Sequence, residues 1–234
     1  MSLRLVVSLT PQELLARVLY RDALMLVLDK PAGLPVHAGP GGGPNLEELF
    51  DALRFGLPRA PALAHRLDRD TSGCLVLGRH RKALARLGRL FAAGRIEKVY
   101  WAIVQGAPDA EAGTVALPLT KLTPKHGWKM VGDPAGQPAV TDWRVLGRAG
   151  ALTWLECRPR TGRTHQVRVH CQALGCPVLG DAVYGTPQEP EPLHLHARAV
   201  GVPLYPARPP VRVEAPPPDH MRAALAACGW RAAG

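Results

Sequence analysis

The sequence lacks the features of several well-defined protein classes. Its 234 residues include five cysteines, and no two of them form a Cys-x-x-Cys pair. An odd number of scattered cysteines argues against a disulfide framework and is typical of free thiols in a reducing compartment. No apolar run approaches the roughly 18 residues of a membrane span, and the first apolar run is too short for a signal peptide. We therefore expect a soluble, cytoplasmic protein.

Signatures of common catalytic and metal-binding classes are also missing. The glycine-rich stretch at residues 39–43 lacks the Lys-Ser/Thr ending of a phosphate-binding loop. Ser72 lacks the preceding glycine of a nucleophile elbow. The histidines and cysteines between residues 165 and 176 do not have the spacing of common zinc modules. We expect no metal site.

Acidic residues are scarce relative to basic ones. The chain has 19 Asp and Glu against 29 Lys and Arg, which gives a formal net charge of +10. Such an excess favours a polyanionic partner, most simply nucleic acid. The alternative is a basic protein whose composition merely prefers arginine. The charge alone does not decide between these two interpretations.

The pattern of helix and strand signals predicts a mixed fold. Apolar periodicity predicts helices over 45–53, 81–93, 164–174 and 220–228, and strands over 24–28, 74–77 and 99–104, with several short strands between 113 and 155. Asn45 and Asp219 are expected to cap the first and last of these helices, and Thr10 to start a short N-terminal one. There is no repeat and no regular alternation of strands with helices.

These signals predict the α+β class, with a mixed, largely antiparallel β-sheet core and flanking helices. No linker is long or polar enough to separate two domains. We expect residues 1–17 to form an N-terminal lead-in and residues 18–234 to form a single domain.

Three segments concentrate polar side chains, and the first is His-Arg-Leu-Asp-Arg-Asp-Thr-Ser-Gly at 65–73. Its carboxylates, Asp68 and Asp70, lie among basic and hydroxyl groups. By composition alone a solvated turn accounts for it. However, the segment leads directly into the apolar strand predicted at 74–77, and functional loops are commonly mounted on rigid strand ends.

The second segment, 158–170, contains four arginines and two histidines around a glycine turn. Its backbone N–H groups at a predicted helix start suit contact with phosphate or nucleic acid. An arginine of this cluster could also pair with a buried carboxylate and keep it ionised. The alternative is an amphipathic helix with a basic outer face.

The third segment is the predicted strand that begins at Glu97. Lys98 and Tyr100 share one face of it. A tyrosine beside a cationic cluster can stack on an extruded base. The alternative is a tyrosine that belongs to the core.

Taken in order along the chain, these segments resemble the motifs of the RluA family of pseudouridine synthases. The resemblance covers nearly the whole sequence. It is carried by the segments Asp-Lys-Pro-Ala-Gly-Leu (29–34), His-Arg-Leu-Asp through Thr-Ser-Gly (65–73), Lys-Val-Tyr (98–100), Gly-Gln-Pro-Ala (136–139) with Thr141, Thr-Gly-Arg-Thr-His-Gln-Val-Arg-Val-His (161–170), Gly-Cys-Pro-Val-Leu-Gly-Asp-Ala-Val-Tyr-Gly (175–185) and Leu-His-Ala (195–197).

The resemblance implies roles for individual residues. Asp68 would be the catalytic aspartate, and Arg168 would pair with it. Tyr100 would stack on the target base, and Arg66 would hold the flipped-out nucleotide or the place it vacates. Val167 stands where the family usually has Leu or Ile and would form an apolar wall of the substrate site. Lys98 would belong to the same site, although its motif and that of Lys30 also suit a structural role.

The resemblance further implies isomerisation of uridine in structured RNA, either tRNA or 23S rRNA, without a cofactor. The family pattern begins near Val18, so we expect a catalytic-domain-only member without the N-terminal RNA-binding module that many members carry. Nothing in the sequence requires more than a monomer.

Two other function classes remain open at this point. One is a non-catalytic RNA-binding protein or ribosome-assembly factor, although binding a polyanion does not require the Asp68 carboxylate. The other is a nucleoside hydrolase, which would normally use two cooperating carboxylates. Asp70 is the nearest second candidate, and its spacing from Asp68 does not exclude that role.

Overall fold

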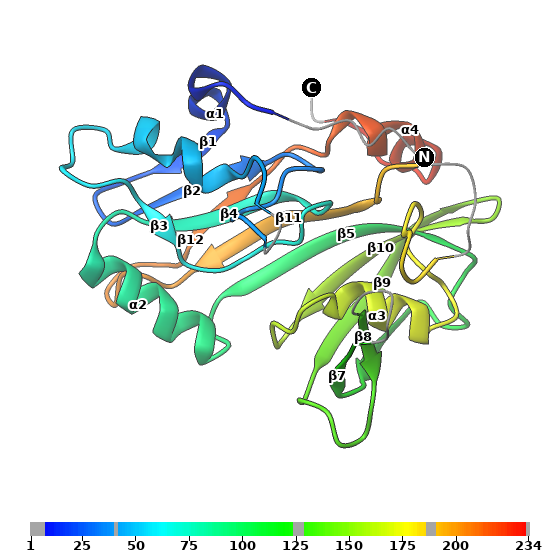
Figure 1. Cartoon of the computed structure of the whole chain (residues 1–234). Coiled ribbons are helices and arrows are strands. Elements are labelled where there is room, and N and C mark those ends of the chain that lie inside the picture. The colour runs from blue at the N-terminus through cyan, green and yellow to red at the C-terminus, as the bar shows by residue number, and fades with distance from the viewer. Residues whose placement is uncertain (1–7, 40–41, 124–128, 186–190, 233–234) are drawn as a thin grey trace. The chain divides into compact units, whose positions relative to one another are not determined.

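The computed structural model describes residues 8–39, 42–123, 129–185 and 191–232. The chain divides into two compact units, each built from two chain segments (Figure 1). Unit 1 comprises Met1–Ile96 and Ala197–Pro216, and unit 2 comprises Glu97–His196 and Pro217–Gly234. The division into a lead-in at 1–17 and one domain at 18–234 stays a prediction. Part of the glycine-rich stretch at 39–43, residues 40–41, lies outside the described residues.

Unit 1 is built around antiparallel strands. Strand β2 pairs with β1 on one side and β4 on the other, β4 neighbours β11, β12 pairs with β11, and the short β3 pairs with β4. These strands are β1 (Val18–Arg21), β2 (Met25–Lys30), β3 (Ala62–Leu63), β4 (Ser72–Gly78), β11 (Leu195–Val202) and β12 (Val211–Glu214). All seven residues of β4 are buried, which makes it the centre of the unit.

The described residues of unit 1 include three helical elements, namely α1 (Pro11–Ala16), the 3-10 helix η1 (Leu46–Leu53) and α2 (Arg81–Ala92). Thr10 and Glu13 form the expected capping box of α1. Asn45 occupies the N-cap position of η1, as predicted, but it makes no capping hydrogen bond, because its side chain donates to Glu48 and to the Gly43 carbonyl. Helix α2 buries its apolar face, including Leu87 and Leu90, against β2 and β4.

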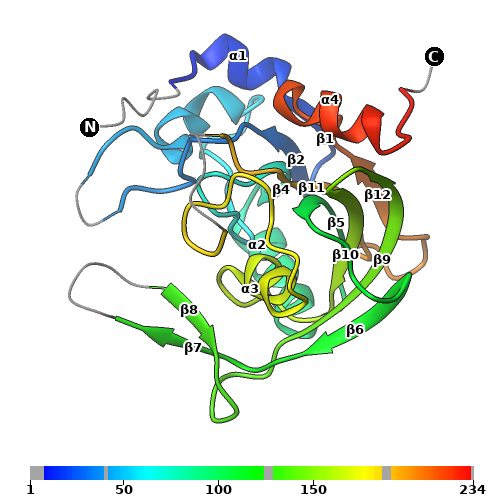
Figure 2. The same cartoon turned by 90° about the vertical axis from the view of Figure 1, so that its right-hand side faces the viewer.

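Unit 2 contains a second run of antiparallel strands, in the order β5, β10, β9, β6 (Figure 2). They are β5 (Glu97–Gln105), β6 (Ala112–Ala116), β9 (Val140–Ala149) and β10 (Leu152–Pro159), and a separate hairpin joins β7 (Leu119–Leu122) to β8 (Lys129–Gly132). Helices α3 (Gln166–Ala173) and α4 (Asp219–Ala227) complete the unit. The short strands expected between residues 113 and 155 are present as β6, β7 and β8, whereas β9 and β10 are longer than expected, with 10 and 8 residues.

The strand β5 shows the predicted alternation of faces. Tyr100, Ala102 and Val104 pack on the apolar cluster that includes residues of α3, whereas Trp101 and Ile103 pack on the cluster that includes residues of α4. Both faces of β5 are therefore covered by apolar side chains of unit 2. On the face that Tyr100 shares with Ala102 and Val104, Tyr100 is partly buried and the other two are fully buried.

The structure corrects the predicted elements at two further points. The proline-rich segment 206–218 contains β12, which sequence reasoning missed because prolines are expected only at the margins of a sheet. Asp219 is the first residue of α4, and Pro218 occupies the N-cap position, so the predicted Asp219 cap is wrong. All five cysteines are buried free thiols, as predicted. Among the described residues, no helix has the length and apolarity needed to span a bilayer.

Candidate active site

The loop that carries Asp68 connects β3 to β4 in unit 1. Leu67 is buried and anchors it, Asp68 is half-buried, and Arg66 is exposed. The Thr71 amide donates to the Asp68 carbonyl at 3.2 Å, which closes a turn around the two acidic residues. Both carboxylate oxygens of Asp70 accept from the guanidinium of Arg69, at 2.9 and 2.8 Å.

Lys30, the last residue of β2, holds this loop in place through its side chain. Its side chain is fully buried, and its Nζ donates to the carbonyls of Pro31, Arg69 and Thr71 at 2.7, 2.8 and 2.9 Å. Each of the three N–H groups of the Lys30 ammonium therefore has a carbonyl oxygen as its acceptor. Two of those carbonyls flank the turn that follows Asp68. Lys30 therefore fixes the backbone on which the carboxylate is mounted.

Burial has a clear effect on Lys30. It lowers the pKa of this side chain to about 7, against the opposing charges of Asp70 and Asp68. A second contact supports the same loop, since the Gly33 amide donates to the Arg69 carbonyl at 3.0 Å. The Asp-Lys-Pro-Ala-Gly segment thus holds the Asp68 loop through backbone contacts, in agreement with a structural role for Lys30.

The two ends of the Asp68 loop are also held tightly. At its start, the His65 Nε2 accepts from the Val76 amide at 3.0 Å, and the His65 ring stacks on Phe91 of α2 with ring centroids 4.5 Å apart. At its end, Gly73 has a φ of 104°, and a Cβ there would lie 2.3 Å from the Ala197 carbonyl oxygen. The hydroxyl of Thr71 is buried and has no hydrogen-bond partner among the described residues.

In unit 2, β5 presents Lys98 and Tyr100. The Lys98 Nζ donates to the Thr161 carbonyl at 2.6 Å, and burial lowers the pKa of Lys98 to about 8. Tyr100 packs against the same apolar cluster that contains Val167 of α3. The predicted face shared by Lys98 and Tyr100 thus lies against the segment that begins α3.

Arg168 of α3 forms a buried, bidentate ion pair with Asp181. Its Nε and Nη2 each donate to a carboxylate oxygen at 2.7 Å, and the side chains are only 7% and 0% exposed. Asp181 also accepts from the Val183 and Tyr184 amides at 2.9 and 3.0 Å, and the guanidinium carbon lies 5.0 Å from the centroid of the Tyr184 ring. This environment fixes the orientation of the Arg168 side chain.

The start of α3 is held by a polar network. Gln166 Nε2 donates to the Val140 carbonyl at 3.0 Å and to the Thr141 hydroxyl at 2.9 Å, while its Oε1 accepts from Thr161 at 2.7 Å. His170, one turn later, bonds to the same Thr141 hydroxyl at 2.9 Å. Gln166 and His170 therefore share one face of α3, and both side chains are buried.

The structure places the predicted residues in both units. Arg66 and Asp68 belong to unit 1, and Lys98, Tyr100, Val167 and Arg168 belong to unit 2. The pairing of Arg168 with Asp68 and the stacking of Tyr100 on a base stay predictions. Asp181 was missed as the partner of Arg168 because the two are 13 residues apart and no helical or strand spacing relates them. The only signal was its place in the late motif at 175–185.

Within residues 8–39, 42–123, 129–185 and 191–232, no three His, Cys, Asp or Glu side chains are grouped so that they could hold a metal ion.

Known proteins share this arrangement of motifs. The sequence profile of the RNA pseudouridylate synthase family matches residues 24–173. The chain belongs to this family. An uncharacterized RNA pseudouridine synthase of Zymomonas mobilis is 43% identical over 206 residues, which cover 86% of the chain and 94% of that relative. The match confirms the predicted enzyme class, an RNA-modifying isomerase.

Other relatives extend the family comparison. The ribosomal large subunit pseudouridine synthase D of Xanthomonas campestris is 42% identical over 75% of the chain, which spans only 53% of that relative's length. Among solved structures, human RNA pseudouridylate synthase domain containing 4 has a TM-score of 0.79 at 30% identity, covering 93% of this chain and 95% of its own. Human RNA pseudouridylate synthase domain containing 1 has a TM-score of 0.76 at 27% identity. These family structures confirm the predicted α+β class.

Proposed function

We propose that the chain converts uridine to pseudouridine in structured RNA, with Asp68 as the catalytic residue. The observation that supports this role is the mounting of the Asp68 loop. Lys30 and Gly33 fix its backbone, and a fully buried strand follows it. A carboxylate held this way can act at a defined atom, as nucleophilic or base catalysis requires.

The reaction breaks the bond between the base nitrogen and the anomeric carbon, rotates the base and rejoins it through carbon 5. The proton on carbon 5 leaves in the last step and the freed base nitrogen takes up a proton, so product and substrate have the same composition. No electrons are gained or lost overall, so we propose that no redox cofactor takes part. The target base must leave its stack to react, at a cost of about a few kcal/mol.

The remaining site residues receive roles that rest on the family motifs. We assign base stacking to Tyr100, an apolar wall to Val167, contact with the flipped nucleotide to Arg66, and support of the substrate site to Lys98. Arg168, whose guanidinium is held by Asp181, is assigned the role of partner to Asp68 that the family motif implies.

The decisive experiment replaces Asp68 by Asn and measures tritium release from RNA labelled at carbon 5 of uridine. We expect Asp68→Asn to fold, to bind RNA and to release no tritium. Asp70→Asn is the matched control, since it removes an equal charge two residues away, and we expect it to retain activity. Substantial release by Asp68→Asn would contradict the assignment.

The same assay tests the hydrolase alternative. Both oxygens of Asp70 are engaged by Arg69, which occupies the second carboxylate that a hydrolase would need near Asp68. Free uracil in the reaction, together with loss of activity in Asp70→Asn, would favour hydrolysis over isomerisation.

The target RNA is proposed to be tRNA or 23S rRNA. The name of the Xanthomonas relative, a ribosomal large subunit synthase, favours 23S rRNA. Deleting the gene and mapping lost pseudouridines by carbodiimide-based primer extension across all stable RNAs would identify the position.

A further inference from the structure

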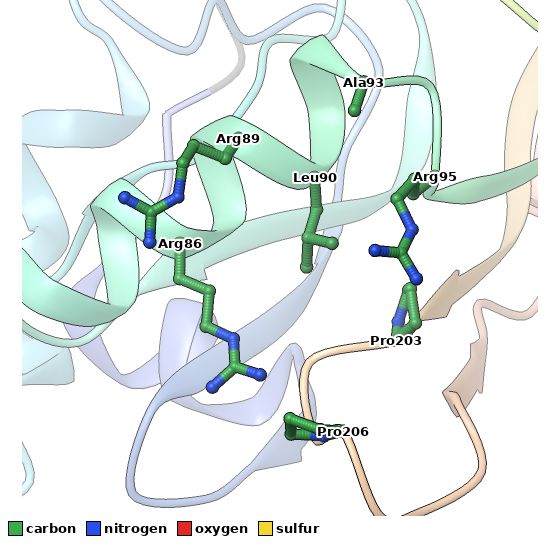
Figure 3. Close-up of a pocket in the computed structure, with 7 residues that line it drawn as sticks. All are labelled: Arg86, Arg89, Leu90, Ala93, Arg95, Pro203 and Pro206. Atoms are coloured by element: carbon green, nitrogen blue, oxygen red, sulfur yellow. The ribbon is translucent and has the colours of Figure 1, made fainter.

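Unit 1 contains a cavity of about 450 Å³ that is separate from the Asp68 loop. Three arginines line it together with apolar residues, and the full set is Arg86, Arg89, Leu90, Ala93, Arg95, Pro203 and Pro206. Figure 3 shows Arg86 and Arg95 on either side of Leu90, extending toward the loop of Pro203 and Pro206. In the same view, the side chain of Arg89 extends away from that loop. We call this cavity the basic pocket.

The basic pocket lies in the least acidic part of the chain. From Thr71 to Ile96 the sequence contains five arginines and one lysine and no Asp or Glu. Elsewhere, at least ten arginines of the described chain form ion pairs with carboxylates, such as Arg160 with Asp142. Among the described residues, the three pocket arginines form no ion pair. Their positive charges are therefore left for a ligand from outside the chain.

The first turn of helix α2 carries positive charge against the electrostatic preference of a helix N-terminus. Arg81 and Lys82 lie in its first turn, which has no acidic residue, although the N-terminal end of a helix favours negative charge. Lys82 and Arg86 are four residues apart, and Arg86 and Arg89 are three apart, so like charges face each other on the helix surface. This repulsion is relieved when an anion binds.

We propose that the basic pocket binds phosphate groups of the RNA backbone, away from the nucleotide that is modified. Guanidinium groups donate in a planar fork that matches phosphate oxygens, so Arg86 and Arg95, which extend toward the same loop, suit a phosphate site, and Arg89 adds positive charge beside it. The apolar floor of Leu90 and the two prolines offers no competing acceptor side chain. The proposal rests on the proposed function, because it takes the RNA substrate as the polyanion.

The pocket is connected to the Asp68 loop through one helix. Phe91 of α2 stacks on His65, which lies three residues before Asp68, while the neighbouring Leu90 lines the pocket. Both Leu90 and Phe91 belong to, or pack on, the same apolar cluster as β2 and β4. RNA held at the pocket would therefore be held by the same rigid part of unit 1 that carries the catalytic loop.

The test compares two triple variants that remove the same charge. The pocket variant is Arg86→Gln/Arg89→Gln/Arg95→Gln. The control variant is Arg59→Gln/Arg148→Gln/Arg231→Gln, whose sites lie outside the pocket on the protein surface. Binding is measured by filter retention of an unmodified tRNA transcript and of unmodified 23S rRNA, over a range of salt concentrations.

We expect the pocket variant to bind its RNA about tenfold more weakly or worse at low salt, and the control variant to lose much less. The slope of log affinity against log salt should fall by roughly two in the pocket variant, because up to three phosphate contacts are lost. Equal affinities and equal slopes in the two triple variants would overturn the proposal, and would leave an acidic protein partner as the occupant to test.

Kinetics separate anchoring of RNA from a role in chemistry or folding. An anchoring site binds ground state and transition state equally, so the pocket variant should raise KM and keep its rate at saturating RNA. Its thermal midpoint should equal or exceed that of the wild type, because like-charge repulsion on α2 is removed. A large loss of saturating rate or of thermal stability would contradict the proposal.

Photo-crosslinking gives a direct readout that does not require activity. A benzophenone side chain at Ala93, inside the pocket, should crosslink to RNA, and one at Ala223 on α4 serves as the control. No RNA crosslink at Ala93 would overturn the proposal. If the wild type and the control variant release no tritium on any RNA, the proposed function fails, while the binding and crosslinking results still decide the pocket.

Discussion

At the scale of single residues, the least expected finding is how Arg168 is held. The sequence marked it as a partner of a carboxylate, and the structure gives it Asp181, which is itself fully buried and accepts two backbone amides. Burial raises the pKa of Asp181, but hydrogen bonds and charge from Arg168 outweigh it and leave the pKa below its ordinary value. Asp181 is thus a positioning residue for Arg168.

Replacing Asp181 by Asn should destabilise the protein by about 3 kcal/mol at neutral pH, since it leaves a buried guanidinium without its charge partner. The lowered pKa means that the stabilisation is present above the ordinary aspartate pKa and is lost as pH falls through the folded value. Below about pH 4, the variant should therefore lose less stability with acid than the wild type. Urea unfolding at several pH values measures both effects.

The matched control for that experiment is Asp142→Asn. Asp142 forms a similar two-bond pair with Arg160, but that guanidinium is 64% exposed. Exposed ion pairs contribute little to stability, so this variant should stay close to the wild type at neutral pH. Equal losses in the two variants would show that burial of the Arg168 pair is not the source of its effect.

At the scale of elements, the approach of β4 to β11 depends on a glycine. Gly73 adopts a left-handed φ, and a Cβ there would overlap the backbone of Ala197. Gly73→Ala should destabilise the protein by roughly 3 kcal/mol and reduce activity, because the strands must separate next to the Asp68 loop. Gly150→Ala is the control, since Gly150 also has a positive φ but open space around it. Thermal unfolding and tritium release of both variants check this prediction, and similar losses would contradict it.

Elements with a strong local signal were predictable from the sequence. The periodicity of 81–93 and the run 74–77 gave α2 and β4 nearly at their observed bounds, because packing against one core reinforces the local preference. The strand β12 was not predictable, since prolines surround it and its pairing with β11 is a long-range contact. The helical signal at 45–53 was right in place, but the element is a 3-10 helix.

The candidate site, like the fold, could be predicted from the sequence only in part. The sequence predicts site roles for Asp68, Tyr100 and Arg168 because local motifs carry these residues. The burial of Lys30 beneath the Asp68 loop and the partnership of Arg168 with Asp181 depend on contacts across 39 to 41 and 13 residues, which spacing rules do not reach. The basic pocket was missed because Arg95 and Pro203 are far apart in the sequence and meet only in the folded unit.

At the scale of the whole molecule, the net charge of +10 should govern binding more than chemistry. Phosphate contacts release counterions, so affinity for RNA falls steeply as salt rises.

Between about 50 and 200 mM salt, we expect kcat/KM to drop by at least tenfold, with nearly all of the change in KM. Single-turnover rates at saturating enzyme should stay almost constant, because the isomerisation neither gains nor loses net charge. Tritium release measured under steady-state and under single-turnover conditions separates kcat/KM from the saturating rate. RNA binding by Asp68→Asn serves as a reference and should show the same dependence on salt as kcat/KM. A saturating rate that falls in parallel with kcat/KM would mean that salt acts on the fold or on the catalytic step itself.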